Sequence, residues 1–226
     1  RYISVTGVQT CALPICAPSY CCLAGPGSWP ARAGDPVGEF NTSVPNHGLD
    51  VVLARPTERS ITVSLRSADA QAVSLDWALA TGGGAQGHAE ATLAAGVPQS
   101  VELAGLSADR EYRYAVRGGA GILAEGRFHT PRAAGQAFTF TVTADSHLDA
   151  GTRTDVFEQT LRNIVADAPD LHFDLGDTFM TEKYAAYQDA RAQYVAQRYW
   201  FGMLSRTSSL FLVLGNHDGE IGRAHV

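Results

Sequence analysis

The stretch Leu171-His-Phe-Asp-Leu-Gly-Asp177 decides the fold of the second half of this chain. It joins a short apolar run to a glycine and an acid, as a buried strand does where it enters a loop. Similar runs lie on either side of it, Phe138-Thr-Phe-Thr-Val-Thr143 before it and Leu210-Phe-Leu-Val-Leu214 after it. The last run is continuously apolar, which is typical of a strand buried on both faces of a parallel sheet.

Helical patterns separate these three predicted strands. Residues 154–167 repeat apolar side chains at helical spacing, at Val156, Phe157, Leu161, Ile164 and Val165, and Pro169 ends the pattern. Residues 182–204 are rich in Ala, Gln, Arg and Tyr and form the second predicted helix. The order strand–helix–strand–helix–strand predicts a parallel sheet with right-handed crossovers.

Residues 49–132 follow a different pattern, which predicts an antiparallel β-sandwich. Apolar and polar residues alternate in short runs that turn residues interrupt. The predicted strands are 50–54, 60–65, 73–77, 101–103, 111–116 and 126–130. We therefore expect a multidomain β plus α/β chain, with a sandwich at 49–132 followed by the first β-α-β-α-β part of an α/β domain at 137–220.

Composition and charge limit the possible classes of protein. Of the 226 residues 45% are hydrophobic and 18% are charged, so the chain can bury a core and is not of a disordered type. The net charge of -6 gives no electrostatic reason to expect a nucleic-acid scaffold as partner. No apolar run reaches the roughly 18–20 residues of a membrane span. The 4 cysteines all precede Leu23, so no disulfide framework is expected in the body of the protein.

The two ends of the chain do not read as parts of these domains. Val5–Ile15 and Ile221–Val226 resemble translated sequencing adaptors, one at each end. We therefore expect 1–48 to be an artefactual or unstructured leader, adaptor-like over 1–15, and 221–226 to be an adaptor-like tail.

Each predicted strand of the second half ends in a polar cluster. The clusters are Asp145-Ser-His147, Gly176-Asp177 and Gly215-Asn-His-Asp218. They should meet, because ligands of open α/β sheets bind beyond the carboxyl ends of the strands. Carboxylate, imidazole and amide oxygen are ligands for hard to borderline cations. Asp145 and His147 are two residues apart and would face the same way in extended backbone, and Asp177 could bridge two ions. The two glycines should let the backbone pass close to the ions.

The three blocks D-x-H, G-D and G-N-H-D, each after a predicted strand, resemble the first three blocks of the calcineurin-like metallophosphoesterase family over about residues 137–220. The preceding text, RPTERSITVSL, VELAGLSADREYRYAV and GRFHTP, resembles the fibronectin type III-like N-terminal domain of purple acid phosphatases. The resemblance implies a hydrolase that acts on phosphate mono- or diesters with two divalent or mixed-valence ions, Fe, Mn or Zn. It also favours an extracytoplasmic location.

The resemblance also implies a role for each site residue. Asp145 and His147 would hold the first metal, Asp177 would bridge the two metals, and Asn216 would bind the second. Two further residues would be catalytic: His217 would contact the substrate phosphate or protonate the leaving oxygen, and Asp218 would orient the His217 imidazole.

The chain departs from the purple acid phosphatases in three respects, and other readings stay open. His147 stands where their first block normally has a residue other than histidine, and Met180 stands where their iron-binding tyrosine is expected. Two later blocks, a lone His and G-H-x-H, do not appear. We therefore expect a truncated chain with a competent parent enzyme, an inactive fragment and exposed faces on the last strand. The alternative function is a non-catalytic binding module built on the sandwich. His172 and Asp174 are expected to be a packed core histidine and a structural acid.

Overall fold

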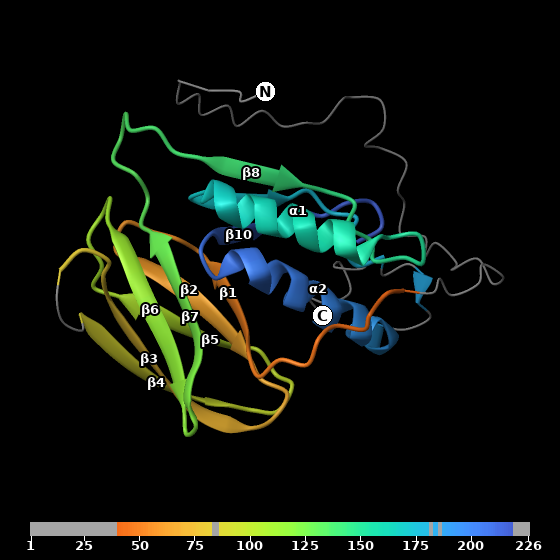
Figure 1. Ribbon diagram of the computed structural model, residues 1–226, viewed down its shortest axis with the longest axis horizontal. Helices are drawn as coiled ribbons and strands as arrows, with labels where there is room; N and C mark the ends of the chain where they lie inside the picture. The colour runs from red at the N-terminus through yellow and green to blue at the C-terminus, as the bar shows by residue number, and fades with distance from the viewer. Residues whose placement is uncertain (1–39, 83–85, 181–182, 185–186, 219–226) are drawn as a thin grey trace, which may run out of the picture. The chain divides into compact units, whose positions relative to one another are not determined.

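The computed structural model describes residues 40–82, 86–180, 183–184 and 187–218, which belong to a unit spanning Pro36–Val226 (Figure 1). Residues 1–39 of the expected leader (1–48) and the whole expected tail (221–226) lie outside the described residues. Residues 40–48 are described, and the backbone N–H of Asn41 donates to the carbonyl of Leu148 at 2.6 Å. None of the helices in the described part has the length and apolarity needed to cross a membrane.

Two antiparallel sheets form over the region where the sequence predicts a sandwich. The first has the order β1-β2-β5, from β1 (Asp50–Ala54), β2 (Ser60–Arg66) and β5 (Gln99–Ala104). The second has the order β4-β3-β6-β7, from β4 (Gly87–Leu93), β3 (Gln71–Leu79), β6 (Glu111–Gly118) and β7 (Gly121–His129).

The apolar faces of these strands pack into one core, as their alternation predicts. Ile61, Val63 and Leu65 of β2 are buried in it. From β6 the core takes up Tyr112, Tyr114 and Val116. The Tyr112 hydroxyl accepts a hydrogen bond of 2.8 Å from the backbone N–H of Ser107. This bond from a strand tyrosine to backbone a few residues upstream is the tyrosine corner found in immunoglobulin-like sandwiches.

Strand β4 is a strand that the sequence did not predict. Its inward positions are the small residues Ala89 and Ala91, and only Leu93 at its end is a bulky buried side chain. Alanine is depleted in strands and gives a weak alternation signal. Pairing with β3 over its whole length, from Gln71↔Leu93 to Trp77↔Gly87, provides the order that the local sequence lacks.

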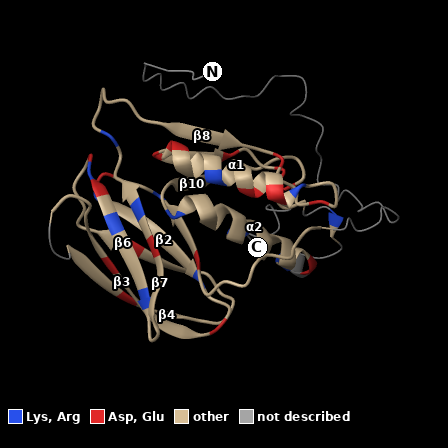
Figure 2. Cartoon of the chain, viewed as in Figure 1, with Lys and Arg blue, Asp and Glu red and all other residues tan. Residues whose placement is uncertain are grey.

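Charged residues of both signs lie along the strands of the sandwich (Figure 2), and some of them form exposed ion pairs. Arg117 contacts Asp76 at 3.2 Å, and Arg127 contacts Glu111 at 3.8 Å. Exposed ion pairs of this kind contribute at most about 1 kcal/mol each. The apolar core therefore stabilises the sandwich far more than its surface charges do.

The predicted parallel sheet is present, with the order β10-β9-β8. It consists of β8 (Phe140–Thr143), β9 (Leu171–Asp174) and β10 (Ser209–Leu212), and β9 pairs in parallel with both neighbours. Because all three strands run in the same direction, their carboxyl ends lie at one edge of the sheet. The polar clusters that follow the strands begin at that edge.

Two helices connect these strands. The first predicted helix is confirmed as α1 (Thr154–Asp167), with Leu161 and Ile164 buried, Val156 exposed, and the left-handed Ala168 at its carboxyl end before Pro169. The second, α2 (Arg191–Ser205), begins later than predicted, because a 3-10 turn, η2 (Tyr187–Ala190), precedes it. Leu210 of β10 packs with Leu161, Ile164 and residues of α2, so both helices cover the same face of the sheet.

The last strand shows the exposed apolar residues expected for this chain, and not the burial on both faces of which its apolar run is typical. The strand ends at Leu212, and Leu212, Val213 and Leu214 are 49%, 47% and 53% exposed. Phe140 and Val142 of β8 are also about half exposed, at 46% and 47%. The helices cover one face, and no described segment covers the other. A continuous apolar run indicates that a strand needs to be buried, but it does not identify the segment that covers the strand.

Helix α2 also contacts the sandwich. The backbone N–H of Leu53 in β1 donates to the Ser205 hydroxyl at 3.0 Å. The Tyr114 hydroxyl donates to the carbonyl of Arg206 at 3.1 Å, and the Arg198 guanidinium donates to the Ser64 carbonyl at 2.9 Å. The bonds of Leu53 and Ser64 satisfy backbone groups of β1 and β2 and tie α2 to the first sheet, and the Tyr114 bond ties the residue after α2 to β6 of the second sheet.

Candidate metal centre

The loops after β8 and β9 lie side by side and carry the candidate ligands. The backbone N–H of Asp145 donates to the carbonyl of Gly176 at 2.9 Å, and that of His147 donates to the carbonyl of Asp177 at 3.3 Å. These two bonds continue the pairing of the strands beyond the end of the sheet. They bring residues more than thirty positions apart in the chain into one site.

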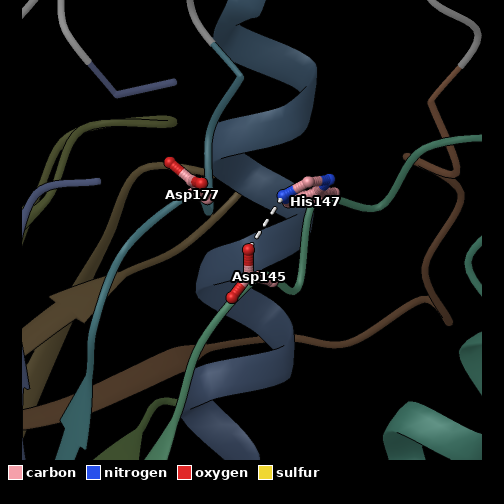
Figure 3. Close-up of side chains that lie close together, drawn as sticks. All are labelled: Asp145, His147 and Asp177. Atoms are coloured by element: carbon pink, nitrogen blue, oxygen red, sulfur yellow. Dashed lines mark ion pairs between the residues drawn. The ribbon is translucent and has the colours of Figure 1, made fainter. Parts of the chain in front are cut away.

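Asp145, His147 and Asp177 form one cluster (Figure 3). One ligand atom from each lies within 4.8 Å of the others, so the three could contact a single cation. The His147 Nε2 atom faces Asp145 Oδ1 at 3.7 Å. That nitrogen is buried and has no hydrogen-bond partner in the described structure. A buried imidazole nitrogen without a partner costs free energy, and a metal ion would remove that cost.

The backbone of this cluster is left-handed, not extended. Asp145, His147 and Asp177 have φ values of 60°, 35° and 53°, and the neighbouring Leu148 and Met180 have 56° and 44°. The prediction that Asp145 and His147 face the same way because of extended backbone is therefore wrong in its reason. Non-glycine residues avoid this region unless their surroundings impose it, and such residues gather at functional sites.

The loop after β10 adds His217 to the cluster. Its ring lies 5.7 Å from the His147 ring between centroids, in an edge-on arrangement. Its backbone N–H donates to Asp177 Oδ1 at 2.9 Å. Asn216 precedes it in the same loop, with an exposed side chain. The structure thus brings the third predicted block to the first two.

Two glycines allow the second and third loops to touch. A Cβ atom on Gly176, whose φ is +96°, would lie 2.0 Å from the backbone nitrogen of Gly215. A Cβ atom on Gly215 would lie 2.1 Å from Asp177 Oδ1. The sequence predicted glycines for close approach of the backbone to ions. In the structure they are required for close approach of the two loops to one another.

Asp218 is buried, and its carboxylate accepts hydrogen bonds from backbone amides of both loops. Asp218 Oδ2 accepts from the N–H groups of Asp177 at 2.8 Å and Gly215 at 3.0 Å. Asp218 Oδ1 accepts from those of Thr178 at 3.1 Å and Phe179 at 2.8 Å. The carboxylate therefore fastens the Asp177 loop to its own loop. Orientation of the His217 imidazole, the role expected from the sequence, stays a prediction.

Asp149 is a site residue that the sequence analysis missed. Its Oδ2 faces His147 Nδ1 at 3.7 Å, on the opposite side of the ring from Asp145. Its Oδ1 accepts from the Gly151 N–H at 3.0 Å and from the Thr152 hydroxyl at 3.0 Å. A carboxylate near Nδ1 favours the tautomer whose Nε2 is free to bind a metal. The sequence signal that could have identified Asp149 is the pattern D-x-H-x-D over residues 145–149.

The sequence also gave no role to Gln193 and Gln197 of α2, which are buried beneath the same loops. Their amides donate to groups of both ligand-bearing loops. In the sequence they were part of a Gln-rich helix with no distinguishing motif.

A buried polar network lies under the site, on the helix-covered face of the sheet. His172 bonds to the hydroxyls of Thr141 at 2.8 Å and Thr143 at 3.0 Å, and Thr143 donates to Asp174 at 2.8 Å. Burial lowers the pKa of His172 to about 4 and raises the pKa of Asp174 above its usual value. Both side chains are fully buried, so the expectation of a packed histidine and a structural acid is confirmed.

The fold is thus a β-sandwich followed by a parallel α/β unit with an acid–histidine cluster at its carboxyl edge. A solved structure described as "Structure of PhoD" is similar at a TM-score of 0.53 and 14% identity, over 74% of this chain and 38% of that one. This chain therefore spans well under half of that protein, and at this identity the likeness concerns the fold.

A fibronectin type III domain of human collagen XX is similar at 22% identity and a TM-score of 0.30, over 39% of this chain and 99% of that one. No protein-family profile matches the sequence, and no curated protein matches it either.

Proposed function

We propose that this chain carries part of the active site of a metal-dependent phosphoesterase. The observation that supports this most directly is the cluster of Asp145, His147 and Asp177, in which the buried His147 Nε2 has no described hydrogen-bond partner. Two carboxylates and an imidazole suit Fe, Mn or Zn, and the mixture of oxygen and nitrogen donors fits such an ion better than Mg²⁺ or Ca²⁺. The PhoD-like fold is consistent with this chemistry.

Asp145 and His147 would hold the first ion, and Asp177 would bridge it to a second ion bound also by Asn216. When bound, such a pair supplies a hydroxide nucleophile and neutralises charge on a phosphate ester. Other residues of the chain would support the site. Asp149 lies 3.7 Å from His147 Nδ1 and would favour a proton on that nitrogen, and Asp218 holds the Asp177 loop against the His217 loop.

His217 would deliver a proton to the leaving oxygen. Its ring lies beside that of His147, at the edge of the cluster. Its backbone N–H donates to Asp177 Oδ1, which keeps residue 217 next to the candidate ligands. A general acid in this position protonates the leaving group as the ester bond breaks. The substrate would be a phosphate mono- or diester.

Replacement of Asp177 by Asn tests the metal site. We expect the wild-type chain to retain Mn²⁺ or Zn²⁺ in equilibrium dialysis, and Asp177→Asn to lose most of it, because a neutral amide cannot bridge two cations. Metal content measured by atomic emission gives the result. Asp69→Asn, an exposed change on the sandwich, is the matched control.

The outcome separates the proposal from its alternative. Equal metal content in the wild-type chain and in Asp177→Asn would refute the bridging role. A wild-type chain that takes up no metal would refute the metal centre and favour a non-catalytic binding role for the sandwich.

A further inference from the structure

Two glutamines of α2 lie one helical turn apart beneath the ligand loops. Gln193 and Gln197 occupy positions i and i+4, so their side chains are on the same face of the helix. Both are fully buried. The rest of that face is the apolar core formed by residues such as Ala196 and Trp200. Buried amides on an otherwise apolar face cost free energy that apolar residues would avoid, so their presence calls for a structural or functional reason.

Each amide donates to both ligand-bearing loops. Gln193 Nε2 donates to the carbonyl of His147 and to that of Thr178, the latter at 3.4 Å. Gln197 Nε2 donates to the Ser146 hydroxyl at 3.0 Å and to the Thr178 carbonyl at 2.8 Å. Backbone carbonyls only accept hydrogen bonds, so these contacts fix which end of each amide faces the loops.

The other end of each amide supports the same interpretation. The Oε1 atoms of Gln193 and Gln197 are buried without a hydrogen-bond partner in the described residues. The helix thus uses two amides whose oxygen atoms are left unsatisfied in order to present two NH₂ groups to the loops. The loops need these donors, because left-handed residues such as His147 and Leu148 hold their shape only under external constraint.

We propose that Gln193 and Gln197 are positioning residues that brace the His147 loop against the Asp177 loop and so set the geometry of the metal cluster. The proposal rests on the proposed metal site, since the brace matters to function only if the cluster binds an ion. The amides touch neither ion nor substrate and act through the carbonyls of residues 147 and 178. Loss of such outer partners typically lowers metal affinity about 10–100-fold.

The test compares Gln193→Met and Gln197→Met with the wild-type chain. Methionine keeps the length and apolar stem of glutamine but has no donor. We expect Co²⁺ to bind at least about 10-fold more weakly to each variant, and its visible absorption to change shape, since ligand geometry sets that spectrum. Gln159→Met on α1, an exposed glutamine that donates to Asn163, is the matched control and should leave both unchanged.

Amide hydrogen exchange of the metal-free chain provides a second, independent measurement. Peptides covering 144–149 and 176–179 should exchange faster in both variants, whereas the β6 peptide 111–118 should not change. Unchanged exchange rates in the two loops would refute the proposal that Gln193 and Gln197 hold the loops together, whether or not Co²⁺ binds. Faster exchange with unchanged Co²⁺ affinity would overturn its role in positioning the ligands. Failure of the wild-type chain to bind Co²⁺ would instead count against the metal centre itself.

Discussion

At the scale of single residues, the candidate centre depends on side chains with distinct tasks. Asp145, His147 and Asp177 offer ligand atoms, and Asp149 and Asp218 fix how those atoms are presented. Hydrogen bonds distinguish the two kinds of residue: Asp218 accepts from four backbone amides, and the His147 Nε2 has no described hydrogen-bond partner.

His217→Ala separates general acid catalysis from metal binding. The backbone bond from residue 217 to Asp177 Oδ1 survives the change, so metal content should stay close to that of the wild type. Turnover should fall by about 10²–10⁴-fold in whichever length of the protein hydrolyses p-nitrophenyl phosphate. Metal analysis beside steady-state kinetics checks this. Loss of the metal together with turnover would make His217 a ligand.

His172 should make stability depend on pH. The pKa of its ring is lowered by burial from 6.5 to about 4. As pH falls from 6.5 to about 4, residue 172 binds a proton in the unfolded chain but not in the folded chain. The free energy of unfolding therefore falls by up to about 3 kcal/mol. The raised pKa of Asp174 acts in the opposite direction, because the folded chain then takes up that proton first.

Urea unfolding of His172→Gln at several pH values isolates the histidine contribution. We expect the loss of stability between pH 6.5 and pH 4 to be smaller in the variant than in the wild type. His88→Gln is the control: His88 is exposed, and the pKa of its ring is raised by Asp76, so its contribution has the opposite sign. Parallel pH curves for the wild type and His172→Gln would contradict the assignment.

At the scale of elements, the site is a meeting of three loops. The strands supply parallel direction, and the loops approach one another through backbone bonds and glycines. Helix α2 lies beneath them and donates to two of the loops. No single loop holds the cluster by itself, so a change in the packing of one loop should alter the conformation of the others.

Gly176→Ala should disturb this meeting. The new Cβ would lie 2.0 Å from the nitrogen of Gly215, and a φ of +96° is unfavourable for alanine. We expect a loss of about 1–3 kcal/mol in the free energy of unfolding, with weakened metal binding. Gly119→Ala is the matched control, because a Cβ there meets no atom within 4 Å. Thermal unfolding with metal titration checks both, and equal stability of the two variants would contradict the close approach.

At the scale of the described molecule, one face of the parallel sheet is apolar and open. The rings of Phe140, Phe173 and Phe211 contact one another across β8, β9 and β10, and Phe140 and Val142 are about half exposed. An apolar patch of this kind favours association with other copies or with other surfaces. The sandwich has a closed core and lacks such a face over its described strands.

Phe140→Glu should reduce self-association of the chain. The charge would lie on the edge strand β8 beside Phe173 and would be costly to bury between copies. Light scattering as a function of concentration should show a smaller mean mass for the variant. Ile122→Glu, a change of a similarly exposed apolar residue on the sandwich strand β7, is the control. If both variants lower the mean mass equally, or if neither lowers it, the open face of the parallel sheet is not the surface through which the chain self-associates.

Sequence periodicity determined the two parts of the fold and the strands that lead into the site. Alternation at Ser60–Arg66 and Glu111–Gly118 and the apolar runs before Asp145, Asp177 and Asn216 are local signals, because a strand must bury one or both faces wherever it lies. Strand β4 could not be predicted from the sequence, because its inward residues are alanines and give little alternation of apolar and polar side chains.

Only the tertiary structure decided how the site is held together. The backbone of Asp145 and His147 is left-handed because its surroundings impose that conformation. The amides of Gln193 and Gln197 bond to residues 15 to 51 positions away, and Asp218 bonds to Asp177, 41 positions away. Such contacts leave no periodic signal, since they depend on the distance between loops and not on neighbours in the chain. The sequence therefore identified the ligand types, whereas their supports became visible only where the chain folds back on itself.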